Sequence, residues 1–311
     1  MSVSRFVLPL LVALTFTAPA LAGKTLEVGE TKTYKTPSAA IAAAADGDKV
    51  LIDPGEYFDC SIVAANDLTI EGTAVDGSAI MTDKACGGKA ILVTQGDNIT
   101  IRNLTLTRAR VPDGNGAGIR AEGNGLLIER VKFLNNQNGI LAAPNPQGTI
   151  TIRDSDFRRN GDCNPSCAHG VYVNALKLLR IEKSRFSDTR RAHHIKSRAL
   201  RTEVIGCEII DGPTGTASYL IEVTNGGTLI VQNSTMEKGP KAENRSTAIV
   251  IGAEGVTQPT REITITNNIF RNAGTYQTTF VTNLTATEAV LKGNKITGKV
   301  EPLRGDGEVV Q

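Results

Sequence analysis

The chain has 311 residues, with 34 Lys or Arg against 32 Asp or Glu, and its formal net charge is +2. This near-balance excludes a generally basic protein, while the length suffices for a large buried core. The chain has no Trp, five Tyr and eight Phe. So few aromatic rings argue against a surface that stacks nucleic acid bases, and we expect no nucleic acid partner.

Residues 1–22 have the features of a secretory signal peptide. Arg5 precedes an apolar run over residues 7–16, and the small-residue site Ala20-Leu21-Ala22 follows. No other segment approaches the roughly 20 apolar residues that a membrane-spanning helix needs. We therefore expect a mature chain from Gly23 that is secreted or periplasmic and has no membrane insertion.

A loose repeat runs through most of the chain. In each copy a polar bend leads to an apolar anchor residue, and successive anchors lie 23 to 34 residues apart. The copies span residues 101–106, 128–133, 152–157, 181–186, 204–209, 231–236, 265–270 and 291–296. Each unit has short alternating strands and no helical periodicity, so it must stack on its neighbours to bury its apolar face. The repeat predicts an all-β, single-domain right-handed parallel β-helix over residues 23–297.

The start of the chain strengthens this interpretation. The Ala-rich residues 37–45, followed by residues 46–52 and 53–57, resemble the capping helix and first turn of the pectin-lyase-like β-helix superfamily. The resemblance covers nearly the whole mature chain and implies an N-terminal helix that blunts the first edge strand. It implies no single activity, because that fold carries lyases, hydrolases, epimerases and adhesins. Residues 298–311 are expected to form a loosely held tail.

Five cysteines in an exported chain favour disulfide pairing. We expect Cys60 to pair with Cys86 and Cys163 with Cys167, which leaves Cys207 as a buried free thiol. The cysteine spacings lack the second pair that a metal site needs. We predict no protein metal site from the cysteines. The sequence leaves open whether a calcium ion takes part.

The three histidines lie in two segments, 169–176 and 193–200, that align as one strand written twice. Side-chain alternation turns the apolar residues inward and the polar residues outward. The inward set is Ile119, Ile140, Val171, Ile195 and Ile221. One outward column is Arg120, Leu141, Tyr172, Lys196 and Glu222, and the next is Glu122, Ala143, Asn174, Arg198 and Thr224, followed by Asn225. We expect His194 to point outward, and His169, His193 and Tyr219 to line the strand entrance.

Residues 177–201 contain nine Lys or Arg and only two acids. A local field of this sign favours an anionic partner, although the same residues are also consistent with a solvated outer face.

The outward columns suit cleavage next to a uronic acid. The proton beside a carboxylate is hard to remove until a cation neutralises that carboxylate. We expect Arg198 to neutralise it and Lys196 to act as the base, with His194 or Tyr172 as alternative bases because Glu222 opposes deprotonation of Lys196. The expected substrate-binding residues are Arg120, Asn174, His169, His193, Tyr219, Thr224 and Asn225.

A second resemblance concerns residues 194–198, which are similar to an Ile-Ser-Val-Lys-Ser stretch in the chondroitinase B and alginate lyase family. It implies that Lys196 is a base. The family's next-turn arginine has no counterpart, because residues 219–225 occupy that turn, and its full acidic calcium site is not evident. The paired aspartates of inverting polygalacturonases are also missing, which disfavours hydrolysis.

The sequence thus predicts an exported, monomeric β-helix enzyme that acts on an anionic polysaccharide as a lyase or a uronate C5-epimerase. The alternative is a non-catalytic glycan-binding or structural surface protein with the same fold.

Overall fold

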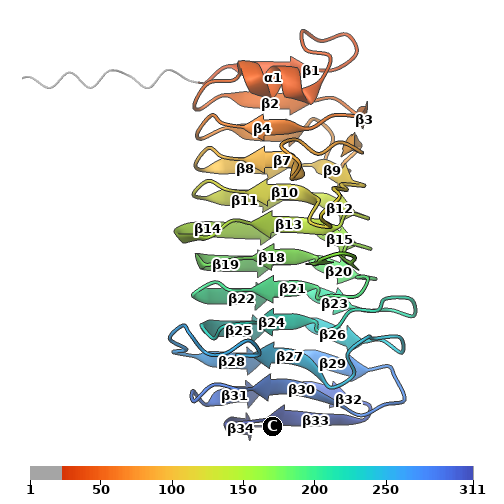
Figure 1. Cartoon of the computed structure of the whole chain (residues 1–311), viewed down its shortest axis with the longest axis vertical. Helices are drawn as coiled ribbons and strands as arrows, with labels where there is room; N and C mark the ends of the chain where they lie inside the picture. Colours follow the sequence, from red (N-terminus) through yellow and green to blue (C-terminus); the bar gives the residue numbers. More distant parts are fainter. Residues whose placement is uncertain (1–22, 311) are drawn as a thin grey trace, which may run out of the picture.

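The computed structural model of the chain describes residues 23–310 as one elongated solenoid, in which each turn lies below the previous one (Figure 1). The expected signal peptide, residues 1–22, lies outside the described residues. Three long parallel sheets, here called A, B and C, run the length of this part of the chain. One strand from each sheet makes up one rung of the solenoid.

Sheet A has twelve strands within the described residues. In stacking order they are β1 (Thr25–Val28), β2 (Lys49–Ile52), β5 (Thr69–Gly72), β8 (Ile99–Arg102), β11 (Leu126–Glu129), β14 (Asn145–Arg153), β19 (Leu176–Glu182), β22 (Arg201–Ile205), β25 (Thr228–Gln232), β28 (Ile263–Thr266), β31 (Ala289–Lys292) and β34 (Gly307–Val310).

Sheets B and C have ten strands each in this part of the chain. Sheet B consists of β3 (Gly55–Tyr57), β6 (Ala79–Thr82), β9 (Leu104–Thr107), β12 (Lys132–Leu134), β15 (Asp156–Arg158), β20 (Arg185–Ser187), β23 (Glu208–Ile210), β26 (Thr235–Lys238), β29 (Ile269–Asn272) and β32 (Lys295–Thr297). Sheet C consists of β4 (Ser61–Val63), β7 (Ala90–Thr94), β10 (Ala117–Ala121), β13 (Asn138–Ala142), β18 (Val171–Val173), β21 (Ile195–Ser197), β24 (Ile221–Val223), β27 (Thr247–Ile251), β30 (Thr278–Asn283) and β33 (Val300–Arg304). A short antiparallel hairpin joins β16 (Asp162–Cys163) to β17 (Cys167–Ala168).

The repeat predicted from the sequence matches the rungs. The anchors form one register in sheet B, where Phe133, Phe157 and Phe186 are paired and their buried rings stack with centroids 4.5 Å apart. The polar bends are the corners between sheets A and B, and several of their residues have a left-handed backbone. Asn103, Arg130, Asp154, Lys183, Asn233 and Asn267 have φ between 47° and 58°. The right-handed parallel β-helix is confirmed.

The capping helix is also present, as α1 (Pro37–Ala43). Thr36 is its N-cap and accepts a hydrogen bond from the Ala39 N–H at 3.4 Å. Ala40 and Ile41 are buried and belong to the same apolar core as Val50 and Ile52 of β2. Figure 1 shows α1 at the N-terminal end of the stack, where it covers the core.

The expected loose tail after Gly298 is wrong. Residues 300–304 and 307–310 form β33 and β34, which pair in parallel with β30 and β31. The tail supplies backbone donors and acceptors to the open end of two sheets, which Pro302 and Gly305 do not prevent. The solenoid therefore continues through residue 310.

The cysteine predictions hold. Cys60 is bonded to Cys86, Cys163 is bonded to Cys167, and Cys207 is free and buried. The second disulfide closes the β16–β17 hairpin beside sheet C. No helix in residues 23–310 is long and apolar enough to cross a bilayer.

Candidate functional site

The outward column predicted on sheet C forms one register across five rungs. Arg120 pairs with Leu141, Leu141 with Tyr172, Tyr172 with Lys196, and Lys196 with Glu222. The apolar residues between them are buried, as the alternation required. This column is the floor of the candidate site.

Lys196 on this floor and Arg198 in the next outward column hold a carboxylate that the sequence analysis missed. Lys196 Nζ lies 2.6 Å from Glu254 Oε1, and Arg198 Nη2 lies 2.5 Å from Glu254 Oε2. Burial opposes ionisation of Glu254, but Lys196 and Arg198 outweigh it and hold its pKa below the usual value. Glu254 follows β27, between Gly252 and Gly255, which both have positive φ. We call Lys196, Arg198 and Glu254 the carboxylate clamp.

Tyr172 lies against the clamp. Its hydroxyl oxygen accepts a hydrogen bond from Arg198 Nε at 3.1 Å, and Lys196 Nζ lies 5.7 Å from its ring centroid. Arg198 is further held by the Asn225 side chain and by Gln258, whose Nε2 donates to the Arg198 carbonyl at 2.7 Å. Although burial opposes its charge, Tyr172 and Glu254 raise the pKa of Arg198 above the usual value. The hydroxyl of Tyr172 is therefore fixed beside a permanent cation.

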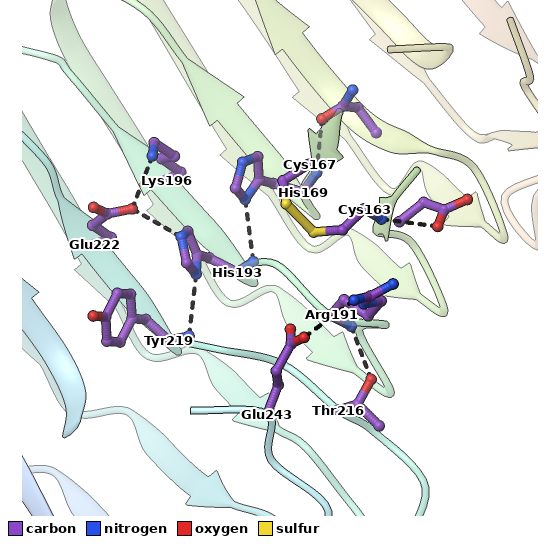
Figure 2. Close-up of a disulfide and its surroundings, with 12 residues drawn as sticks. Cys163, Cys167, His169, Arg191, His193, Lys196, Thr216, Tyr219, Glu222 and Glu243 are labelled. Atoms are coloured by element: carbon purple, nitrogen blue, oxygen red, sulfur yellow. Dashed lines mark hydrogen bonds and ion pairs between the residues drawn. A yellow bond between two sulfur atoms is a disulfide. The ribbon is translucent and has the colours of Figure 1, made fainter. Parts of the chain in front are cut away.

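Glu222 anchors Lys196 from below. Its Oε2 lies 3.2 Å from Lys196 Nζ and 2.9 Å from His193 Nε2, and its side chain is only 3% exposed (Figure 2). Burial raises the pKa of Glu222, but these two neighbours outweigh burial and the net shift is downward. Glu222 is thus an ionised carboxylate within ion-pair distance of two nitrogens.

His169, His193 and Tyr219 form a column beside the floor, as expected for the strand entrance. The ring centroids of His169 and His193 are 4.8 Å apart, and those of His193 and Tyr219 are 4.9 Å apart. The backbone N–H of His193 donates to His169 Nδ1, and that of Tyr219 donates to His193 Nδ1, each at 3.1 Å. Figure 2 shows both contacts.

These bonds fix the tautomers, because a backbone N–H can only donate. Both Nδ1 atoms are acceptors, so each neutral ring carries its proton on Nε2, and His193 donates that proton toward Glu222. Burial lowers the pKa of both histidines, that of His169 strongly. With Nδ1 occupied and Nε2 protonated, neither ring has a free basic nitrogen.

A pocket of about 350 Å³ opens above these residues, and we call it the proximal pocket. Tyr172, His193 and Lys196 line its floor, and the Cys163–Cys167 disulfide forms one wall. Glu243 lines another part of this pocket and lies 3.4 Å from Arg191 (Figure 2).

A second pocket, also of about 350 Å³, adjoins the first at Tyr172. We call it the distal pocket. Its lining residues come from rungs nearer the N-terminus: Gly88, Lys89, Asp113, Asn115, Arg120, Leu141, Tyr172 and Asn174. The two pockets place Arg120 and Asn174 on one side of Tyr172, and Lys196 of the clamp on the other.

His194 does not point outward, contrary to expectation. Its side chain is fully buried, with Nε2 2.8 Å from Asp211 Oδ1 and Nδ1 2.7 Å from Thr189 Oγ1. Arg191 and Ala192 have positive φ, so the chain turns just before β21 and the strand alternation does not extend back to His194. His194 is excluded as a base in the groove.

Two further expectations need correction. Thr224 is fully buried, so its side chain cannot contact a ligand. The basic segment 177–201 is not one positive surface, because its residues are divided among three faces. Arg180 and Arg201 face outward from sheet A, paired with Glu203, whereas Arg185 is paired with Glu208 on sheet B. Within this segment, only Lys196 and Arg198 form ion pairs with Glu254.

No metal site can be assigned in residues 23–310, where no three His, Cys, Asp or Glu side chains are grouped to hold an ion. The clamp is built from cations and one carboxylate, which is a donor set for an anion.

The fold and the two pockets define a parallel β-helix protein with a cluster of paired charges on one sheet. A family model described as "Right handed beta helix region" matches residues 145–302. The chain belongs to this right-handed β-helix family. No curated protein matches it in sequence.

Two solved structures are similar in fold. An alginate lyase from Paenibacillus sp. str. FPU-7 has a TM-score of 0.64 at 15% identity, covering 91% of this chain and 99% of that one. Pectate lyase Pel9A has a TM-score of 0.54 at 16% identity, covering 90% of this chain and 79% of that one. At such identities the likeness is one of fold.

Proposed function

We propose that the protein is an exported polysaccharide lyase that cleaves an acidic polysaccharide beside a uronic acid. The similar folds named above are an alginate lyase and a pectate lyase, and both names refer to acidic polysaccharides. This supports a polysaccharide as the substrate class. The proposed reaction and its residues rest on the contacts around the two pockets.

The observation that carries the proposal is the carboxylate clamp. Lys196 and Arg198 converge on one carboxylate, that of Glu254, beside the Tyr172 hydroxyl. A uronate carboxylate has the same shape and charge, so it can replace Glu254 between these two cations. Negative charge builds on that carboxylate when the neighbouring C5 proton leaves, and the two cations stabilise it.

The contacts of Lys196 lead us to revise its role. Its ammonium group lies within 3.2 Å of two carboxylates, Glu222 and Glu254. A protonated amine has no lone pair with which to take a proton, so we assign Lys196 to charge neutralisation. Proton transfer then falls to Tyr172, which the sequence analysis held as an alternative base. Arg198 Nε donates to its oxygen at 3.1 Å, and this contact orients the Tyr172 oxygen beside the clamp.

In this mechanism the Tyr172 phenolate takes the C5 proton of the uronate. The electron pair left on C5 forms the C4=C5 double bond, and the bond from C4 to the glycosidic oxygen breaks. The leaving oxygen receives a proton, either from the Tyr172 hydroxyl just formed or from water. Glu222 and His193 do not touch the reacting atoms; they hold Lys196 in place.

The test follows the ultraviolet absorbance of the unsaturated uronate while the mature protein is incubated with alginate, pectate and other acidic polysaccharides. We expect a rise with one polymer. Tyr172→Phe should lower the rate by about 10³-fold or more, whereas Lys196→Arg, which keeps the charge, should retain roughly a tenth of the activity.

Complete loss in Lys196→Arg with activity retained in Tyr172→Phe would return the base to Lys196. No absorbance rise with any polymer that the protein binds would contradict the lyase and favour the non-catalytic glycan-binding alternative.

A further inference from the structure

We propose that the distal pocket binds a second acidic sugar of the same polysaccharide, three residues along the chain from the sugar that reacts. This inference rests on the proposed function, because it assumes that a uronate occupies the carboxylate clamp. It adds the direction in which the polymer lies and the shortest oligosaccharide that fills the groove.

The distal pocket has cationic donors left over for a ligand. Lys89 Nζ and Arg120 Nε lie 2.6 Å and 3.4 Å from the same oxygen of Glu122. Arg120 Nε is buried and has no hydrogen-bond partner among the described residues, and the Arg120 side chain is 24% exposed. Asp113 also lines the pocket, so the opposite charges there balance, and the partly exposed guanidinium of Arg120, whose Nε has no partner in this part of the chain, supplies the donors for a ligand. A second carboxylate is the ligand that suits it.

The rest of the pocket suits a pyranose ring. Leu141 lies on the floor between Arg120 and Tyr172, lines the pocket together with Tyr172, and packs against Ala90 and Val93, which are buried. A sugar ring has an apolar face that can lie on such a surface, with hydroxyl groups at its rim. Asn174 uses its Nδ2 to donate to the Ala142 carbonyl at 2.8 Å, which leaves its Oδ1 to accept from a sugar hydroxyl.

The spacing of the rungs sets the length of the ligand. Arg120 on β10 is three rungs from Lys196 on β21, with β13 and β18 between them. Rungs are about 4.8 Å apart, so the two cationic sites are separated by roughly 14 Å. One pyranose in a polysaccharide extends about as far as one rung. A chain lying along the solenoid axis therefore presents sugar n to the clamp and sugar n+3 to Arg120, and a tetrasaccharide is the shortest ligand for both.

The test measures binding of uronate oligosaccharides of two to five residues by calorimetry at low salt. The Tyr172→Phe background prevents turnover, and Arg120→Met is compared with Arg185→Met. Arg185 is the matched control because it makes a similar ion pair, 3.5 Å from Glu208, on sheet B. We expect affinity to rise sharply between the trimer and the tetramer. Arg120→Met should weaken the tetramer roughly tenfold while leaving the dimer unchanged, and Arg185→Met should change neither.

Equal affinity for dimer and tetramer, or an unchanged length dependence in Arg120→Met, would overturn the inference. The lyase can fail separately. Length-dependent binding that Arg120→Met abolishes, without any double bond formed by the unsubstituted protein, supports the distal pocket and rejects the lyase. Turnover with no effect of Arg120→Met on length dependence supports the lyase and rejects the distal pocket.

Discussion

The outer faces of sheet A and sheet C both carry closely spaced charges, but the charges are arranged differently. On sheet A, arginines and glutamates alternate in a chain of ion pairs that we call the charge ladder, with successive contacts of 2.5 to 3.7 Å. Its members are Arg102, Glu129, Arg153, Glu182, Arg180, Glu203, Arg201 and Glu262. On sheet C, the charges converge on the carboxylate clamp beside two pockets.

Burial separates the two faces further. The arginines of the charge ladder have side chains 31% to 44% exposed, whereas Lys196 is 11% exposed and Glu222 only 3%; Arg198 is 24% exposed, and only Glu254 of the clamp, at 43%, is as exposed as the ladder. Exposed pairs are screened by water and contribute little, while desolvated charges interact strongly. The comparison shows that a run of basic residues is weak evidence for a site on a solenoid. Charges that converge on one point, some of them buried, are stronger evidence for a functional site.

The largest expected difference between the two faces is in activity. Arg198→Met removes one cation of the clamp and the donor to Tyr172, so kcat/KM should fall at least roughly 100-fold. Arg180→Met removes a charge ladder arginine of similar reach, and activity should stay within about twofold. Initial rates on the responsive polymer measure both. Equal losses in the two variants would mean that sheet A belongs to the binding surface.

The second effect concerns stability beneath the groove. Lys238 is fully buried, and its amine donates to the carbonyl of Ser218, a residue of the proximal pocket. Burial lowers the pKa of Lys238 from 10.5 to about 8, although Asp211 opposes the shift. Between about pH 8 and 10.5, Lys238 is protonated in the unfolded chain and neutral in the folded chain. The free energy of unfolding should therefore rise as the pH increases through this window, by about 3 kcal/mol in total.

Urea unfolding from pH 7.5 to 10.5 measures this rise. The Lys238→Met variant is the comparison, because it lacks the titrating amine and should show a flatter dependence. The same slope in both proteins would show that another group titrates.

A third effect tests the internal carboxylate of the clamp. Glu254→Gln keeps the shape of the side chain and removes its charge, so it should compete less well with a uronate. Affinity for a uronate oligosaccharide should rise by about threefold to tenfold. Glu243→Gln is the control, since Glu243 is equally exposed and lines the pocket wall without touching Lys196 or Arg198. Weaker binding in Glu254→Gln would mean that Glu254 contacts the ligand.

The smallest effect is expected within the charge ladder. Glu129 lies 3.7 Å from both Arg102 and Arg153, and these contacts are partly exposed. Glu129→Gln should lower the free energy of unfolding by no more than about 0.5 kcal/mol, and high salt should remove the difference. Urea unfolding at two salt concentrations measures it. A loss above about 2 kcal/mol would show that the ladder is a cooperative network.

Much of the fold was predictable because one physical rule repeats. The apolar anchors and the polar corners recur on every rung, and strand alternation gave the correct register of the column from Arg120 to Glu222. The disulfide pairing was predicted from Cys60 and Cys86 in neighbouring turns and from Cys163 and Cys167 in one small loop. Patterns of this kind are present within each repeat, so they can be recognised without knowing which distant residues are in contact.

The remaining features depend on turns and distant segments. His194 precedes its strand by one residue, and the turn at Arg191 and Ala192 rotates it inward toward Asp211. Glu254 is 58 residues from Lys196, in a loop whose path depends on the rungs between them. Its only sequence signal is a lone acid between two glycines after a sheet C strand, on the same side of the solenoid as Asn225.

The column of His169, His193 and Tyr219 also links successive rungs of the solenoid by hydrogen bonds. Each imidazole Nδ1 receives the first backbone N–H of the next layer, so protonation would turn that acceptor into a donor facing a donor. Burial lowers the pKa of both histidines. The two hydrogen bonds to the neutral imidazoles therefore stabilise the fold at a pH above the usual histidine pKa, and this contribution is lost as the pH falls below that value. Acid should therefore loosen the layers first at the groove, while the strand pairing elsewhere keeps the solenoid together. The side of the solenoid that carries the two pockets is therefore the side whose stability responds most to acid.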